Sequence, residues 1–259
     1  ETSPTETGVF QPGLPESFEW KDDEGYRYVS RTQPAYTFAL AACDDTVVSL
    51  PHADGFLSEG TLQRGELFTH VTHDALTGRF ASADKPVVLV TYAPQAYIPW
   101  DFAREGGIDA QPVVTMALPT SAWGSEYVAV RHGDRWEGHA DEAIWRVVGG
   151  ADETRLTYEP YRPTGAPERI ARGELAVFFA TEPFVVRSQD AAHAFYLSQS
   201  MTGVRYQIER YGIPDEPRGG AVTVHQLATT LWARRYGFFA VPAMPEQSLV
   251  LVRPRDGGE

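Results

Sequence analysis

The sequence predicts an all-β fold made of two tandem β-sandwich-like modules, related by an internal repeat of about 108 residues. Two short motifs recur at that spacing and in the same order. The Arg-Gly-Glu-Leu run at residues 64–67 returns unchanged at 172–175, and Asp-Asp-Thr at 44–46 returns as Asp-Glu-Thr at 152–154. A period of this length matches one small domain, which favours two copies of a module over a solenoid.

A third recurrence marks the end of each copy. A leucine, a tryptophan and a tyrosine return about 109 positions later: Leu118, Trp123 and Tyr127 in the first copy, and Leu227, Trp232 and Tyr236 in the second. We interpret each tryptophan as the large core residue of its module, and each tyrosine as a strand residue whose hydroxyl bonds to the backbone. Asp84 is aligned with Asp190 by the same comparison.

Short apolar segments between these motifs predict the strands. Residues 36–40 and 46–50 are expected to form a hairpin in the first copy, as are 144–148 and 154–158 in the second. Further strands are expected at 87–92, 127–130, 192–197, 236–241 and 248–252. The chain has 23 glycines and 19 prolines, which punctuate short strands and favour a sandwich. The best helical candidate, 224–235, aligns with a segment that contains Pro119, which argues against a long helix.

These patterns divide the chain into three parts. Residues 1–25 are expected to be a flexible N-terminal tether, because the first residues are rich in Thr, Ser, Pro and Glu. Residues 26–127 form the first module. Residues 128–259 form the second, and they include a C-terminal strand of a truncated third repeat. A tether of this kind often follows a cleaved signal or a lipid-anchor site, and the alternative is a disordered start without such a role.

Composition excludes several classes of function. The formal net charge is −13, from 22 basic and 35 acidic residues, so binding to a nucleic-acid backbone is not expected. The longest apolar run, at 86–90, is far shorter than the roughly 20 residues that span a bilayer. Cys43 is the single cysteine, which rules out an intrachain disulfide. The sequence implies no cofactor.

No catalytic or metal-binding motif stands out. A Gly-x-Ser-x-Gly elbow, a phosphate-binding glycine loop and a His-Glu-x-x-His motif are all absent. Cys43 is followed by acidic residues, which makes it a poor nucleophile. The recurring acidic pairs at 44–45 and 152–153 are interpreted as turns rather than calcium sites. His70 and His73 form an H-x-x-H pattern, but a strand would point them to opposite faces, so no metal is expected.

Two long segments, 93–111 and 198–220, occupy the same place in both copies. Both are rich in aromatic residues, and long loops on rigid scaffolds often carry function. We therefore predict ligand contact there. The alternative is that these side chains pack the loops onto the sheets. The predicted contact residues are Tyr97, Trp100, Asp101, Tyr206 and Tyr211.

Several motifs together resemble the N-terminal domain family of IgGFc-binding protein. They are Leu-Thr-Gly at 76–78, the Asp-Lys-Pro-Val strand at 84–87, and the Leu-Pro-x-Ser-x-Trp-Gly-x-Glu-Tyr junction at 118–127. The resemblance covers most of residues 26–252, although the second copy has lost the Lys-Pro and the glycine after its tryptophan. It implies a secreted or surface-displayed all-β protein without known catalysis. Many bacterial relatives look lipid-anchored, which places an expected anchor upstream of residue 1. No catalytic or Fc-binding residues carry over.

The sequence therefore predicts an exported bacterial cell-surface binding or adhesion module without catalytic activity. Its expected partner is a protein or glycan surface. A second hypothesis is a structural subunit that assembles by strand addition into a filament, appendage or surface layer. A third is a carbohydrate-active enzyme of jelly-roll type that uses two carboxylates.

Overall fold

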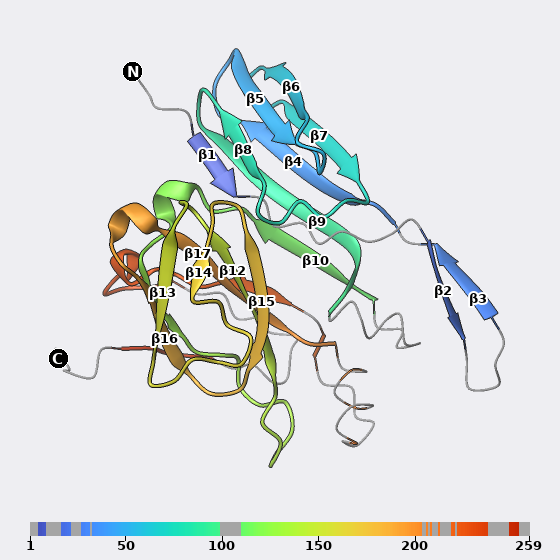
Figure 1. Ribbon diagram of the computed structural model, residues 1–259. Coiled ribbons are helices and arrows are strands. Elements are labelled where there is room, and N and C mark those ends of the chain that lie inside the picture. The colour runs from blue at the N-terminus through green and yellow to red at the C-terminus, as the bar shows by residue number, and fades with distance from the viewer. Residues whose placement is uncertain are drawn as a thin grey trace.

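The computed structural model describes residues 5–8, 17–21, 27–31, 33–98, 110–203, 206, 208, 212, 219–220, 222–237 and 249–253. Nearly half of these residues lie in four four-stranded antiparallel sheets, which pack face to face in two pairs (Figure 1). The all-β prediction is thus confirmed. Each pair encloses its own cluster of buried apolar side chains. We call them the N-terminal and the C-terminal sheet pair.

In the N-terminal sheet pair, one sheet has the order β1 (Thr5–Gly8), β8 (Phe80–Ala83), β5 (Thr46–Pro51), β6 (Leu57–Leu62). The facing sheet has the order β10 (Ala110–Met116), β9 (Val87–Tyr97), β4 (Ala35–Ala41), β7 (Leu67–Thr72). A separate hairpin joins β2 (Ser17–Lys21) to β3 (Arg27–Arg31).

The C-terminal sheet pair has the same arrangement. One sheet has the order β11 (Glu126–Ala129), β16 (Phe184–Ser188), β13 (Thr154–Glu159), β14 (Arg169–Ile170). The other has the order β15 (Leu175–Ala180), β12 (Ala143–Gly149), β17 (Phe195–Met201), β18 (Thr223–His225). Short 3-10 turns lie at η1 (Thr120–Ala122), η2 (Ala191–His193) and η3 (Thr229–Leu231).

The predicted hairpins have the right strands but the wrong pairing. β4 pairs with β7 and β9, whereas β5 pairs with β6 and β8 in the facing sheet. β12 and β13 are separated in the same way. Each connection therefore crosses from one sheet to the other, through a left-handed residue, Asp45 (φ 52) or Glu153 (φ 55). Alternation gives a strand one buried face, but it does not specify the neighbour with which the strand pairs.

The recurring motifs build the same corner in both sheet pairs. The Asp44 carboxylate accepts a hydrogen bond from the Arg64 backbone N–H at 3.0 Å, and Asp152 accepts one from Arg172 at 3.0 Å. The glutamate of each Arg-Gly-Glu-Leu motif accepts from the backbone N–H three residues earlier, at 2.7 Å in both cases. The interpretation of the acidic pairs as turns is therefore confirmed for these two aspartates.

The alignment of Asp84 with Asp190 is off by one residue. Asp84 accepts a hydrogen bond from the backbone N–H of Val47 at 2.7 Å, and Gln189 does the same for Arg155 at 2.8 Å. Gln189 thus holds the place of Asp84. Asp190 instead caps η2 through bonds from two backbone N–H groups of that turn.

The chain ends also differ from expectation. Residues 5–8, assigned to the flexible tether, pair with β8 and cover its edge, and β2 lies in the tether segment as well. The helical candidate at 224–235 contains β18 and η3 instead of a helix. Residues 236–237 and 249–252 are not in strands, and the rest of the two C-terminal strand predictions lies outside the described residues.

Trp123 packs between the two sheet pairs instead of inside one module. Its ring lies 5.8 Å from the Phe80 ring in the N-terminal pair and 5.5 Å from the Tyr196 ring in the C-terminal pair. The backbones also touch here, because a Cβ on Gly78 would lie 2.3 Å from the Gly173 carbonyl oxygen. We call this contact the seam. The prediction that Trp123 lies in the core of its own module is therefore wrong, although the residue is buried.

Trp232, by contrast, is only partly buried. Its indole N–H reaches the carbonyl of Leu227 at 3.3 Å. The core interpretation of this second tryptophan is wrong, because nothing in the described part of the chain covers it as the seam covers Trp123.

The tyrosine interpretation is confirmed for Tyr127, which lies in β11, whereas Tyr236 has the predicted hydroxyl bond to the backbone but is not in a strand. The Tyr127 hydroxyl accepts a hydrogen bond from the Gly124 N–H at 3.0 Å and donates to the Phe195 carbonyl at 2.6 Å. The Tyr236 hydroxyl accepts from the Ala233 N–H at 2.7 Å. The same turn therefore closes both junctions.

His70 gives the N-terminal sheet pair a pH dependence. Its buried ring lies 4.3 Å from the His52 ring, and burial, together with the charge of His52, lowers the pKa of His70 against the opposing charge of Asp74. A histidine whose pKa is lowered in the folded state contributes its full stability above its unfolded pKa of 6.5, and this stability is lost as the pH falls through the lower folded pKa.

We expect the melting temperature of the protein to drop from pH 7.5 to pH 5, and we expect the drop to be smaller in His70→Leu. The control is His73→Gln, and an equal drop in both variants would contradict this assignment.

Candidate binding site

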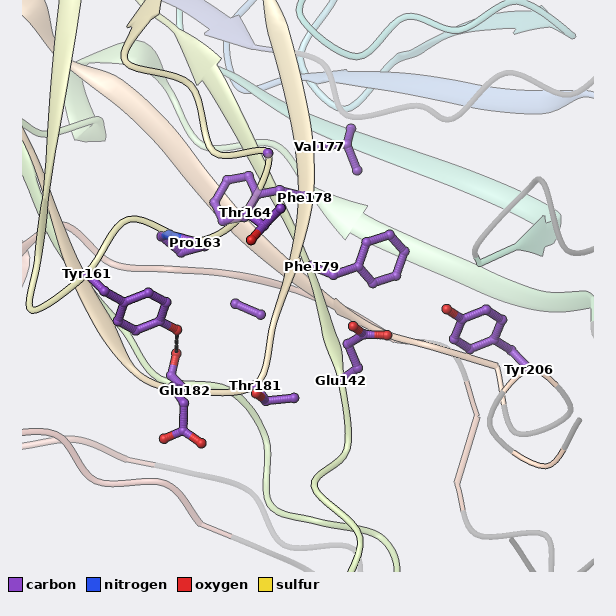
Figure 2. A pocket seen from close by; sticks show the side chains of 12 residues that line it. Glu142, Tyr161, Pro163, Thr164, Val177, Phe178, Phe179, Thr181, Glu182 and Tyr206 are labelled. Carbon is purple, nitrogen blue, oxygen red and sulfur yellow. Dashed lines mark hydrogen bonds between the residues drawn. The ribbon is translucent and has the colours of Figure 1, made fainter. Parts of the chain in front are cut away.

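A pocket of about 640 Å³ lies beside the edge of the C-terminal sheet pair, along β15 (Figure 2). Its walls are mostly aromatic and small side chains, with two carboxylates. Figure 2 shows Phe179 and Tyr206 on one side of the strand and Tyr161 with Pro163 on the other. The lining residues not yet named are Glu142, Thr164, Gly165, Val177, Phe178, Ala180, Thr181 and Glu182.

β15 is an edge strand, because within the described residues its one partner strand is β12. Its sequence, Leu-Ala-Val-Phe-Phe-Ala, contains no charge and no proline. Native proteins usually protect such an edge with lysine, proline or a bulge, since its free N–H and C=O groups can pair with another chain. β15 has no lysine, no proline and no bulge in its pairing with β12, and the side chains of Leu175 and Val177 are exposed.

The opposite wall is held in place by hydrogen bonds from tyrosines. The Tyr161 hydroxyl donates to the carbonyl of Glu182 at 3.0 Å, and the Tyr158 hydroxyl donates to the carbonyl of Pro167 at 2.8 Å. Burial, reinforced by the charge of Glu182, raises the pKa of Tyr161, so its hydroxyl stays protonated and remains a donor. The loop after β13 is thereby fixed beside β15.

This arrangement can hold an extended ligand in two ways. The edge of β15 offers backbone groups for strand pairing, and the aromatic walls offer contact area for side chains at alternate positions. The Glu142 carboxylate at the pocket favours a ligand that carries positive charge, whereas the Glu182 carboxylate points away from the pocket (Figure 2).

The structure places one of the predicted contact residues at this pocket. Tyr206 is buried and lines it. Tyr97 ends β9, and Trp100, Asp101 and Tyr211 lie outside the described residues, so their contact with a ligand stays a prediction. Sequence reasoning missed the β15 wall. The signal was available in the uncharged run at 175–180, which directly follows the recurring Arg-Gly-Glu motif.

Metal-ligating side chains do not gather in the part of the chain that the structure describes, where no group of three or more His, Cys, Asp or Glu residues could hold an ion. Cys43 is free and exposed beside the β4–β5 connection. Within the same residues, we find no helical segment with the length and hydrophobicity of a membrane span.

A β-sheet scaffold with an open apolar edge and an adjoining aromatic pocket is suited to binding an extended ligand. The chain belongs to the family described as IgGFc binding protein, which matches residues 18–259. Comparison with curated proteins and with solved structures gave no significant match. Membership of this family agrees with the resemblance inferred from the sequence and indicates a binding module.

Proposed function

We propose that this chain is a non-catalytic binding module, exported to the bacterial cell surface, that captures an extended protein segment along β15. The observation that carries this proposal is the unprotected apolar edge of β15 beside the aromatic pocket. An added strand would pair with the edge and place alternate side chains against Phe179 and Tyr206. The family's name describes binding to the Fc region of immunoglobulin G, so an Fc fragment is a natural protein probe.

We also propose that the two sheet pairs are copies of one module. The identical strand orders support this division, as do the hydrogen bonds that recur at the acidic corners. In this proposal the first copy spans about residues 26–127 and the second about 128–259. β11 begins at Glu126 and pairs within the C-terminal pair, which moves the boundary between the copies toward the N-terminus, and β1 (Thr5–Gly8) adds a strand from before residue 26 to the first copy.

The test compares ligand binding by the parent protein with binding by a variant that carries a charge on the β15 edge. A displayed library of linear peptides, an immunoglobulin G Fc fragment and a glycan array serve as probes. Val177→Lys should weaken binding of the selected peptides about tenfold or more. Val224→Lys is the matched control, because Val224 lies on β18 at the opposite edge of the same sheet and is 47% exposed, against 48% for Val177.

Trp100→Ala in the same assay tests the predicted loop contacts. Circular dichroism of each variant shows that it is folded. Equal peptide binding by Val177→Lys and the parent protein would overturn strand capture at β15. Binding to glycans alone would also overturn it and would assign the ligand to carbohydrate.

A further inference from the structure

The sheet of β10, β9, β4 and β7 presents an apolar face to solvent. On β4 the inward positions are small residues, such as Ala39 and Ala41, and many large side chains of the sheet point outward. We call these outward side chains the outer face. None of them carries a charge, in a chain with a formal net charge of −13. They are Tyr36, Phe38, Leu40, Leu67, Thr69, Val71, Val88, Val90, Tyr92, Val114 and Met116.

The outer face is continuous across the four strands. Tyr36 stacks on Phe38 with ring centroids 5.9 Å apart and on Tyr92 at 6.0 Å. Val114 and Met116 extend the surface onto β10 and are largely exposed. A large uncharged apolar surface of this kind on a soluble protein marks an interaction site.

The equivalent face of the C-terminal sheet pair is covered over β12 and β17, whereas Leu175 and Val177 on β15 stay exposed. Leu40 and Val88 form one cross-strand pair, and Val148 and Tyr196 form the corresponding pair in the second copy. The first two are 40% and 42% exposed, whereas the second two are 3% and 5% exposed. The difference comes from the seam, where Trp123 clusters with Val148 and Tyr196.

The N-terminal sheet pair supplies the rest of this cover. Ile144, at the position equivalent to Tyr36, is buried against Ala93 of β9, Ile98 directly after β9 and Val113 of β10. The Gly203 N–H donates to the Ile98 carbonyl at 2.8 Å. β10 also contacts β18 of the C-terminal pair. One copy thus covers the β12 and β17 part of the outer face of the next copy along the chain.

The covering surface is itself repeated at the C-terminal end. Leu118 and Trp123, which belong to the seam cluster, correspond to Leu227 and Trp232. η3 repeats η1: in both turns the backbone N–H of the tryptophan donates to the carbonyl of the first residue of the turn. Leu227 is nevertheless 42% exposed, and Leu231 and Tyr236 are exposed beside it. We call Leu227, Leu231, Trp232 and Tyr236 the tail surface.

From these two surfaces we infer that a second copy of this chain docks its tail surface on the outer face, as the first sheet pair docks on the second across the seam. The two surfaces differ and lie on different sheet pairs. The contact is therefore heterologous and leaves one free surface at each end, so assembly continues into an open chain of copies. This contact involves no residue of the β15 edge.

The test is sedimentation velocity of the full chain over a wide range of concentration. The parent protein should form species larger than a dimer that grow with concentration. Val88→Glu on the outer face and Leu227→Glu on the tail surface should each remain monomeric. Leu57→Glu is the matched control, since Leu57 lies on β6 of the other sheet with similar exposure, and it should assemble like the parent protein.

Mixing the two blocked variants gives the decisive result. Each retains the surface that the other has lost, so the mixture should form a one-to-one dimer and nothing larger. Val177→Lys should assemble like the parent protein, which separates failure of this contact from failure of ligand capture at β15. A parent protein that stays monomeric throughout, or a closed dimer unaffected by Leu227→Glu, would overturn the inference.

Discussion

Replacing Trp123 with alanine is expected to lower the free energy of unfolding by about 3–5 kcal/mol, the usual cost of removing a buried tryptophan. Trp123 is 8% exposed and packs against both Phe80 and Tyr196. The equivalent change at Trp232 is expected to cost about 1 kcal/mol, because that ring is partly exposed. The two tryptophans hold the same place in the sequence repeat, so the comparison isolates the contribution of the seam.

Chemical denaturation followed by circular dichroism measures both changes. Tyrosine and tryptophan fluorescence reports whether the sheet pairs still unfold together in Trp123→Ala. Equal losses for the two variants would show that Trp123 gains nothing from its position between the sheet pairs.

Gly173→Ala is expected to destabilise the protein more than Gly65→Ala, although both change the same residue of an Arg-Gly-Glu-Leu motif. Both glycines have a positive φ, 84° at Gly65 and 74° at Gly173, so each substitution costs about 1–2 kcal/mol in backbone strain. A Cβ on Gly65 meets no atom within 4 Å, whereas one on Gly173 would lie 2.8 Å from the Gly78 carbonyl oxygen. Because a backbone atom has to move, Gly173→Ala should cost about 1–3 kcal/mol more.

The difference between the two unfolding free energies is the quantity to measure, since the strain common to both cancels. Thermal melts of the same variants provide an independent check. A Gly65→Ala variant as unstable as Gly173→Ala would mean that the Gly78–Gly173 approach does not hold the seam.

Part of the fold could be predicted because two recurring motifs bond to each other. Asp44 and Asp152 each accept a hydrogen bond from the arginine N–H of the Arg-Gly-Glu-Leu motif in the same copy, so the recurrence of both motifs indicates the same corner twice. Strand pairing was not predictable in this way. The residues of β4 and β5 alternate whether the strands form a hairpin or lie in facing sheets, and the choice depends on neighbours far along the chain.

The sequence also did not show which face of each strand points into the core. A pattern such as Tyr36-Thr37-Phe38-Ala39-Leu40 suggests that the large residues point inward. Here the small residues Thr37 and Ala39 are buried, and the large ones form the outer face. Periodicity fixes which residues share a face, whereas the packing of the whole molecule decides which face is inside.

The candidate site was predictable only through Tyr206. Aromatic composition drew attention to its loop, and the structure places this side chain at the pocket. The other wall depends on β15 being an edge strand, which follows from the order of strands in the sheet. Sequence alone does not give that order, so Phe179 and Tyr161 could not be brought together with Tyr206.

The short connection between β10 and β11 has a mechanical consequence. The Ala117 N–H bonds to Leu89 on one side of the junction, at 2.9 Å. On the other side, the carbonyls of Gly124 and Ser125 accept bonds from Phe195 and Ser188, each at 2.9 Å. A pulling force along the polypeptide would meet these bonds before the junction could extend. We therefore expect the two sheet pairs of one chain to move together under tension, which would keep the β15 edge and the outer face in a fixed relation to each other.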